Sequence, residues 1–291
     1  MTSPLDQVRS RLGAMLFERV AGEEGPQRRE RIHGAAGARW FDESSAICRV
    51  HADAAMFVGG LRALLLQSLH PLAMTAVAGH SGYKGDPWGR LQRTSTFLAT
   101  TTFGTAADAE VAIAQVRAIH SRIRGTTAEG EPYAASDPHL LAWVHVAEAD
   151  SFLVAYQAYG ARPLDEIECD AYVAQVARVG TALGAADLPA TKAELDDALT
   201  AFRPELRSTP EARAAARYLL LHPPLPLPAR APYGLLGAAA VGLLPRWARW
   251  PLRLPWLPVT EATAVRAAGH VATSAIRWVV SPSAVTDPAP R

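Results

Sequence analysis

Apolar residues recur at intervals of three and four along most of this chain. The alternation of apolar and polar residues that marks β-strands is almost absent, and alanine, the strongest helix former, is abundant. This pattern predicts an all-α protein. Helices are expected at about residues 4–21, 44–59, 60–79, 87–103, 106–124, 138–159, 165–183, 191–201, 209–221 and 230–244, with another near 260–280.

Start and stop signals support several of these helices. Thr105 and Asp108 have the spacing of a capping box, and Gly125 is placed to end the same helix. The pair Asp137–Pro138 suits the N-cap and first helical position of the next helix, which Gly160 then closes.

Half of the 22 prolines lie between Pro204 and Pro258, including the run PPLPLP. Proline at this density favours an extended segment or a chain of short helices over long ones. Apolar and aromatic residues surround these prolines, so the segment is expected to pack on the body of the protein. We therefore predict one globular helical domain over residues 1–291, with an irregular, proline-rich C-terminal third.

Composition excludes several classes of protein. The chain is 49% hydrophobic and 20% charged, as expected of a globular protein. Its net charge of +1 predicts no electrostatic attraction to nucleic acid. Two cysteines, Cys48 and Cys169, make no CxxC motif and no disulfide framework. The N-terminus lacks the features of a signal peptide, and the longest apolar run, Leu235–Leu244, is far shorter than a membrane span. A cytoplasmic location is expected.

His120 is the first candidate functional residue. Ile113, Val116 and Ile123 lie seven before, four before and three after it, so these four side chains share one apolar helix face. An imidazole on such a face needs a hydrogen-bond partner or a metal. The spacing alone allows both a core histidine and a metal ligand.

A second candidate group lies on the helix that Asp86–Pro87 begins. Arg90 and Thr94 are four residues apart and share a face with Phe97, which suits a polar ligand held in an apolar pocket. Alternatively, the arginine pairs with a carboxylate and the threonine bonds its own backbone.

The order and spacing of several short motifs resemble a known bacterial family. They read LLLQ…HP, HS…DP..R…T, FG, V..IH..I.G, Y.A.DP.LL.WVH and LG…LP, and they extend from about Gly60 to Pro245. The family, long called DUF2236, includes the MpaB-type oxygenases and the catalytic domain of the latex clearing proteins, which are rubber oxygenases.

The resemblance implies an all-α fold and, as in the rubber-cleaving branch, one non-covalently bound haem b. The family's proximal iron ligand matches His120, and its distal arginine and threonine match Arg90 and Thr94. An activity with dioxygen on a small apolar or amphiphilic organic substrate is then expected. A non-catalytic haem-binding or sensing protein, or a helical protein without metal, is the alternative.

Two departures from the family separate this chain from the rubber oxygenases. The stretch HPLAMTAVAGHS contains no carboxylate where those enzymes have a proposed base. Arg93 stands before Thr94 where they have a lysine, and an arginine does not deprotonate to bind iron. The pocket could therefore be shared while the substrate and chemistry differ.

Two further histidines could contribute. His70, at a helix kink, could line the pocket or cap the broken helix, and His145 could contact the haem or bond a neighbouring helix. His120 and His145 could also hold a non-haem metal together with Asp137 or Glu148.

The segment Tyr233–Pro258 combines an apolar stretch with three tryptophans and three arginines. This composition suits a peripheral contact with lipid headgroups. Packing of the tryptophans on the helical body, or burial at a dimer contact, is the alternative. Neither the substrate nor the oligomeric state follows from the sequence.

Overall fold

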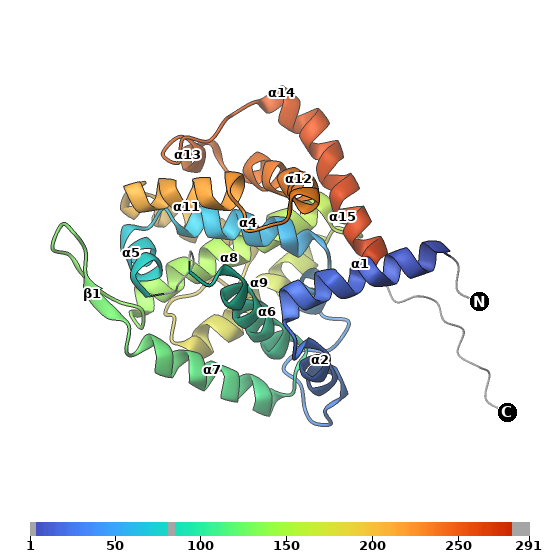
Figure 1. Cartoon of the computed structure of the whole chain (residues 1–291). Coiled ribbons are helices and arrows are strands. Elements are labelled where there is room, and N and C mark those ends of the chain that lie inside the picture. The colour runs from blue at the N-terminus through green and yellow to red at the C-terminus, as the bar shows by residue number, and fades with distance from the viewer. Residues whose placement is uncertain (1–3, 81–84, 281–291) are drawn as a thin grey trace.

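The computed structural model describes residues 4–80 and 85–280, and it confirms the all-α class (Figure 1). The α-helices are α1 Pro4–Ala21, α2 Gly25–Gly34, α3 Ala46–His51, α4 Ala55–Gln67, α5 Pro71–His80, α6 Pro87–Phe103, α7 Ala106–His120, α8 Pro138–Tyr159, α9 Glu166–Leu183, α10 Lys192–Ala201, α11 Pro210–Leu221, α12 Leu227–Leu243, α13 Arg246–Arg249, α14 Pro258–Thr260 and α15 Arg266–Val280. A 3₁₀ turn, η1, spans Arg203–Glu205, and a π-helical turn, η2, spans Glu261–Val265. Strands β1 Arg124–Thr126 and β2 Pro132–Ala134 pair antiparallel.

The predicted N-caps are confirmed. Asp86 accepts a hydrogen bond from the backbone N–H of Gly89, and the Thr105 hydroxyl accepts one from Asp108. Asp137 accepts bonds from the first turn of α8, and Gly160 ends that helix. These caps fix where α6, α7 and α8 begin, because each satisfies a backbone donor that the helix leaves without a partner.

Two predicted helices are each broken in two. The helix expected over 44–59 stops at His51, where the Asp53 carboxylate bonds the backbone N–H of Ala55 and starts α4. The helix expected over 60–79 breaks before Pro71, because proline disfavours helical backbone at the preceding residue, His70. The short polar helix α2 was not predicted, since Ile32 is its one buried large apolar side chain.

The helix expected over 106–124 ends at His120, and Gly125 lies in β1 rather than at a helix C-terminus. Gly125 pairs with Tyr133 of β2, and a side chain at Gly125 would come within 2.6 Å of the Tyr133 hydroxyl. This close approach requires glycine. His120 therefore stands at the end of its helix, where the chain turns into the hairpin.

The proline-rich C-terminal third contains the helices predicted there, with shifted boundaries. Helix α12 runs for 17 residues from Leu227, three residues before the predicted start, and contains Pro232 in its interior. Pro228 lies in the first turn, where proline is well tolerated because that N–H has no helical partner, whereas Pro232 is the sixth residue of the helix. The helix predicted over 230–244 is therefore present despite both prolines.

Helices α4 and α8 cross at the centre of the molecule and form its largest helix–helix contact (Figure 1). A side chain on Gly59 of α4 would meet Phe152 of α8 at 2.7 Å, so the two backbones approach closely there. Leu65 and Leu66 of α4, with Trp143 of α8, are among the fully buried side chains around this crossing. The remaining helices pack around this pair.

A buried ion pair joins the same two helices. Arg62 of α4 and Asp150 of α8 are 2.7 Å apart, with side chains 3% and 4% exposed. The Arg62 guanidinium also donates to the Ser151 hydroxyl at 2.7 Å and to the carbonyl of Leu243, the last residue of α12, at 3.0 Å. One side chain thereby links α4, α8 and α12.

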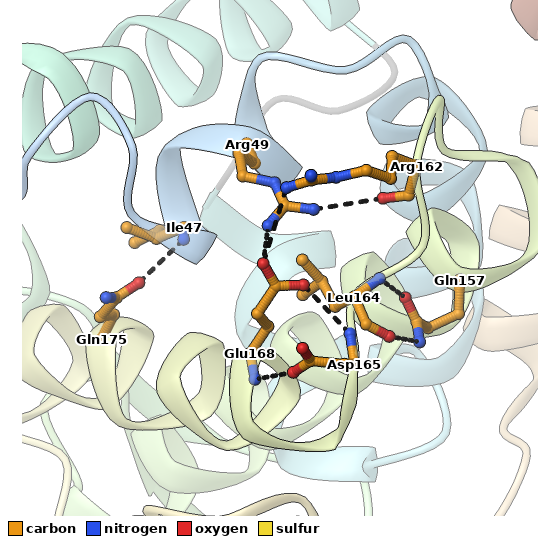
Figure 2. A network of polar contacts seen from close by, with 8 residues as sticks. All are labelled: Ile47, Arg49, Gln157, Arg162, Leu164, Asp165, Glu168 and Gln175. Carbon is orange, nitrogen blue, oxygen red and sulfur yellow. Dashed lines mark hydrogen bonds and ion pairs between the residues drawn. The ribbon is translucent and has the colours of Figure 1, made fainter.

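A second polar network fixes the start of α9 against α3 (Figure 2). Asp165 and Glu168 form a reciprocal capping box, and Glu168 also accepts a hydrogen bond from Arg49 of α3. Figure 2 shows the Arg49 guanidinium reaching over Glu168 to the carbonyl of Arg162. Further along, the backbone N–H of Ile47 donates to Gln175, so α3 is held to α9 at two points.

In the described ranges 4–80 and 85–280, no single helix has both the length and the hydropathy needed to cross a membrane. Helices α4 and α5 taken together reach those values, with a bend of 108° between them.

The buried Arg62–Asp150 pair gives a stability prediction. Asp150→Asn leaves the Arg62 charge buried and without a counter-ion, so we expect the free energy of unfolding to fall by about 3–5 kcal/mol. Glu24→Gln, which removes an exposed helical ion pair with Arg28, is the matched control and should cost about 1 kcal/mol or less. Urea unfolding followed by circular dichroism measures both, and equal losses would contradict a special role for the buried pair.

Candidate functional site

Helices α6 and α7, which carry the two predicted site regions, follow one another as a helical hairpin. Only Gly104 and Thr105 separate the helices, which pack against each other. Arg90 precedes this connection, and His120 follows it, by about four helical turns each. Both residues therefore lie at the open end of the hairpin, and Thr94 lies about one turn closer to the connection.

His120 is half-buried at this open end. Its Nδ1 atom is buried and has no hydrogen-bond partner in the protein, and burial lowers the pKa of the imidazole. Ile113 is buried on the same face, while Val116 is half-buried. One turn earlier, Arg117 donates to the carbonyl of Ala182 at 3.0 Å and ties this end of α7 to α9. His120 is thus a neutral imidazole with an unused buried nitrogen.

The predicted distal residues differ in burial. Arg90 and Phe97 are half-buried, whereas Thr94 is exposed. Arg93 points to the surface, where it pairs with Asp86 at 3.2 Å, and both side chains are well exposed. The arginine that replaces the family's lysine is therefore engaged at the helix N-terminus.

His145 lies on a face of α8 that also carries Leu141 and Glu148, all half-buried. Its ring packs against α9 at Gly180, where a side chain would meet the His145 Nδ1 atom at 2.6 Å. The Nε2 atom is buried without a partner, and burial lowers the pKa of His145 to about 4. Burial also raises the pKa of the Glu148 carboxyl to about 7.

A pair of polar residues that the sequence analysis did not single out lies nearby. His51 of α3 is 2.8 Å from the Thr102 hydroxyl through Nδ1, while its Nε2 is buried without a partner, and burial lowers its pKa to about 3. Its ring centroid is 6.1 Å from that of Tyr172 on α9. The Tyr172 hydroxyl is also buried without a partner, and burial, with the neighbouring Glu148 charge adding to it, raises its pKa well above the usual value.

These unpaired atoms form a pattern. Burying a polar atom without a hydrogen bond costs on the order of 1–3 kcal/mol, so proteins hold few of them. Among the described residues eight such atoms occur, and four helices contribute one each through His51 of α3, His120 of α7, His145 of α8 and Tyr172 of α9. The other four belong to Ser45, His70 and Asp150. Sequence analysis identified His145, but His51 and Tyr172 become recognisable only once α3 is packed on α9.

His70 lies in a separate pocket, between the β1–β2 hairpin and the start of α8. This pocket has a volume of about 640 Å³. It is lined by His70, Leu72, Arg124, Gly125, Thr126, Pro132, Tyr133, Ala134, Asp137, His139, Leu140 and Glu205. Among the predicted cofactor-binding residues, His70 belongs to this lining, and both of its ring nitrogens are buried without a hydrogen-bond partner.

Within the pocket, Glu205 of η1 lies between two histidines. It is 3.0 Å from His139 and 3.5 Å from the buried Nε2 atom of His70, too far for a good hydrogen bond to His70. Burial lowers the pKa of His70, and the Glu205 charge opposes this shift. His139 and Glu205 carried no sequence signal for this contact, since 66 residues separate them.

Among the residues that the structure describes, no group of three or more His, Cys, Asp or Glu side chains is arranged to hold a metal ion. The alternative in which His120 and His145 bind a non-haem metal with Asp137 or Glu148 therefore lacks a ligand set. A haem iron requires a single protein ligand, which His120 could be.

Comparison with known proteins identifies the family to which the chain belongs. Neither a search of curated proteins nor a search of solved structures found a match. The model of one family, described as the catalytic domain of the ER-bound oxygenase mpaB/B′ and rubber oxygenase, matches residues 48–277, a longer region than the motifs alone indicated. The chain belongs to this family of oxygenase catalytic domains.

Proposed function

We propose that the protein is a haem b-dependent oxygenase that acts with dioxygen on an apolar or amphiphilic organic molecule. The observation that carries this proposal is the buried nitrogen of His120, without a hydrogen-bond partner, at the end of α7. Membership of an oxygenase family supports the reaction class. The haem and the type of substrate are our own inference.

The residues present fit a haem. A neutral imidazole can give its lone pair to iron, and burial keeps His120 neutral. Half-buried residues on α6 and α8, including Phe97 and Leu141, offer apolar contacts. With two cysteines and no CxxC, the group would be bound without thioether bonds. When bound, haem supplies the activation of dioxygen.

The chain's own residues would then orient the reactants. His120 would hold the cofactor from one side. Arg90 and Thr94 would donate hydrogen bonds to bound oxygen or to a developing negative charge, and such donors act strongly where water is excluded. Thr94 is more exposed than Arg90.

The rubber oxygenases carry a proposed base upstream of the distal arginine, and this chain has no carboxylate at that position. We propose that Glu148 takes the role of that carboxyl group. A carboxyl with a pKa of about 7 can both donate and accept a proton at neutral pH. Glu148 retains some accessible surface although burial shifts its pKa strongly, which fits a side chain that borders an internal space. We propose that it exchanges protons with the substrate.

The second candidate function is a non-catalytic haem-binding or sensing protein. The missing upstream carboxylate favours it, because such a protein would keep His120 and lose the base. Turnover of dioxygen with a candidate substrate distinguishes the two functions. A cytoplasmic location is part of the proposal.

The first functional prediction concerns the ligand. Protein produced with adequate haem should show a Soret absorption band, and His120→Ala should lose most of the haem because the iron loses its protein bond. His222→Ala, which changes an exposed histidine at the end of α11, is the matched control and should keep the full haem content. Wild-type protein without a Soret band, or equal haem content in all three proteins, would contradict the assignment.

The second concerns the distal side. Arg90→Ala and Thr94→Ala should retain haem but weaken cyanide or dioxygen binding by about tenfold or more, since each removes a hydrogen-bond donor from a charged ligand. Arg93→Ala removes a neighbouring arginine that is engaged at the surface, and it should bind these ligands like the wild type. If all three variants have wild-type affinity, Arg90 and Thr94 face away from the iron.

The third concerns Glu148. The carboxyl keeps its proton up to about pH 7 in the folded protein, but only up to about pH 4.5 when it is exposed. Its contribution to stability is therefore present at low pH and lost as the pH rises towards 7. Glu148→Gln is neutral at every pH. Relative to this variant, wild-type protein should become less stable by roughly 2 kcal/mol between pH 4.5 and 7. Urea unfolding at a series of pH values measures this difference, and parallel profiles would show that Glu148 is not buried as described.

A further inference from the structure

Four large apolar side chains are exposed on the segment that follows α13 and runs into α14. They are Trp250, Trp256, Leu257 and Val259, and Trp250 and Val259 are 86% and 78% exposed. We call this stretch, residues 250–260, the apolar edge. Single exposed apolar residues are ordinary, but a cluster of this kind on one segment indicates a binding surface.

The exposure of the apolar edge does not result from a loose segment. Leu252 is buried in the core in the middle of the edge, and Ala248 is buried just before it. Glu261 closes its far end by accepting a hydrogen bond from the Leu257 backbone N–H at 2.8 Å. The chain is thus anchored at both ends while its tryptophans face outwards.

Arg249 contributes to the same anchor. Its guanidinium pairs with Glu261 at 2.6 Å and donates to the carbonyls of Leu244 and Gly242 at 2.7 Å each. Of the three arginines counted in the sequence, Arg249 is therefore buried and used internally. Trp247 is likewise half-buried, with Arg203 stacked over its ring at 5.4 Å. The packing alternative holds for these two residues.

The charge of the apolar edge is positive. Arg246 and Arg253 are exposed, and residues 245–260 contain no aspartate or glutamate. The Arg246 guanidinium stacks over the Trp256 ring at 4.4 Å. Glu261, the first acidic residue after the segment, is neutralised by Arg249.

We infer that the apolar edge binds the surface of an anionic lipid bilayer. Exposed tryptophans beside arginines suit the lipid interface, because each side chain has an apolar body and a polar tip. The edge lies at the top of the molecule in Figure 1, at the far side from α7, so binding would leave the α6–α7 hairpin away from the bilayer. Binding to a protein partner would not explain why residues 245–260 contain no aspartate or glutamate.

Co-sedimentation of the full-length protein with vesicles tests this inference. Vesicles of phosphatidylcholine with phosphatidylserine should bind the protein at low salt, and vesicles of phosphatidylcholine alone should bind it more weakly. High salt should reduce the difference, since ions screen the arginine–phosphate attraction. Absence of binding to either vesicle at low salt would overturn the inference.

Two double variants assign the binding to the apolar edge. Trp250→Ser with Trp256→Ser should weaken partitioning by about tenfold or more on both kinds of vesicle. Arg246→Gln with Arg253→Gln should remove most of the preference for anionic lipid. Folding is checked by helical circular dichroism, and the four substitutions lie on exposed side chains. Wild-type partitioning by the tryptophan variant would overturn the inference.

Trp278→Ser is the matched control, because Trp278 of α15 is also exposed, at 47%, but lies outside the edge. It should bind vesicles like the wild type, and a loss equal to that of the edge variant would assign binding to α15 instead. Light scattering gives the second check. Should the wild type be a dimer that the edge tryptophan substitutions dissociate, the edge would be a contact between copies and the lipid inference would fall.

Discussion

The buried Arg62–Asp150 pair is the interaction on which the arrangement of the helices depends. Two charges held this far from water remain favourable only when every donor and acceptor is satisfied. Arg62 binds Asp150, Ser151 and the Leu243 carbonyl together, although its ion pair with the Asp150 Oδ2 atom lacks the geometry of a hydrogen bond. This requirement sets the register of α4 against α8 and brings the end of α12 to the same point. The C-terminal third is thereby attached to the central pair of helices. Arg249 makes an equivalent set of buried contacts for the segment that follows.

Much of the fold could be predicted because its determinants are local. Asp86, Thr105 and Asp137 each bond backbone donors within the next three residues, so their effect is visible in the sequence. The break after His51 was missed, and the one before Pro71 was expected only as a kink at His70 within one helix. Apolar spacing continues through both breaks, and it outweighed the proline signal. The same bias extended α7 past His120 into a hairpin that depends on the contact of Gly125 with Tyr133.

The residues of the candidate site also differ in whether the sequence alone could identify them. His120 and Arg90 were proposed from helix faces and from family resemblance, and they remain predictions. His51 and Tyr172 could not be identified in this way, because 121 positions separate them and only the packing of α3 on α9 brings their rings within 6.1 Å. Glu205 reaches His70 and His139 across similar gaps. A residue whose role depends on a tertiary contact produces no periodic pattern in a single sequence.

Polar groups are buried in two ways in this molecule. The Arg62 and Arg249 guanidinium groups are buried with carboxylate partners, and their contacts link helices that are distant in the sequence. His51, His120, His145 and Tyr172 each bury one atom without a hydrogen-bond partner, and Glu148 holds a proton at a pH where an exposed carboxyl would lose it. Each buried atom without a partner costs free energy, so a bound group that gave it a partner would recover that energy.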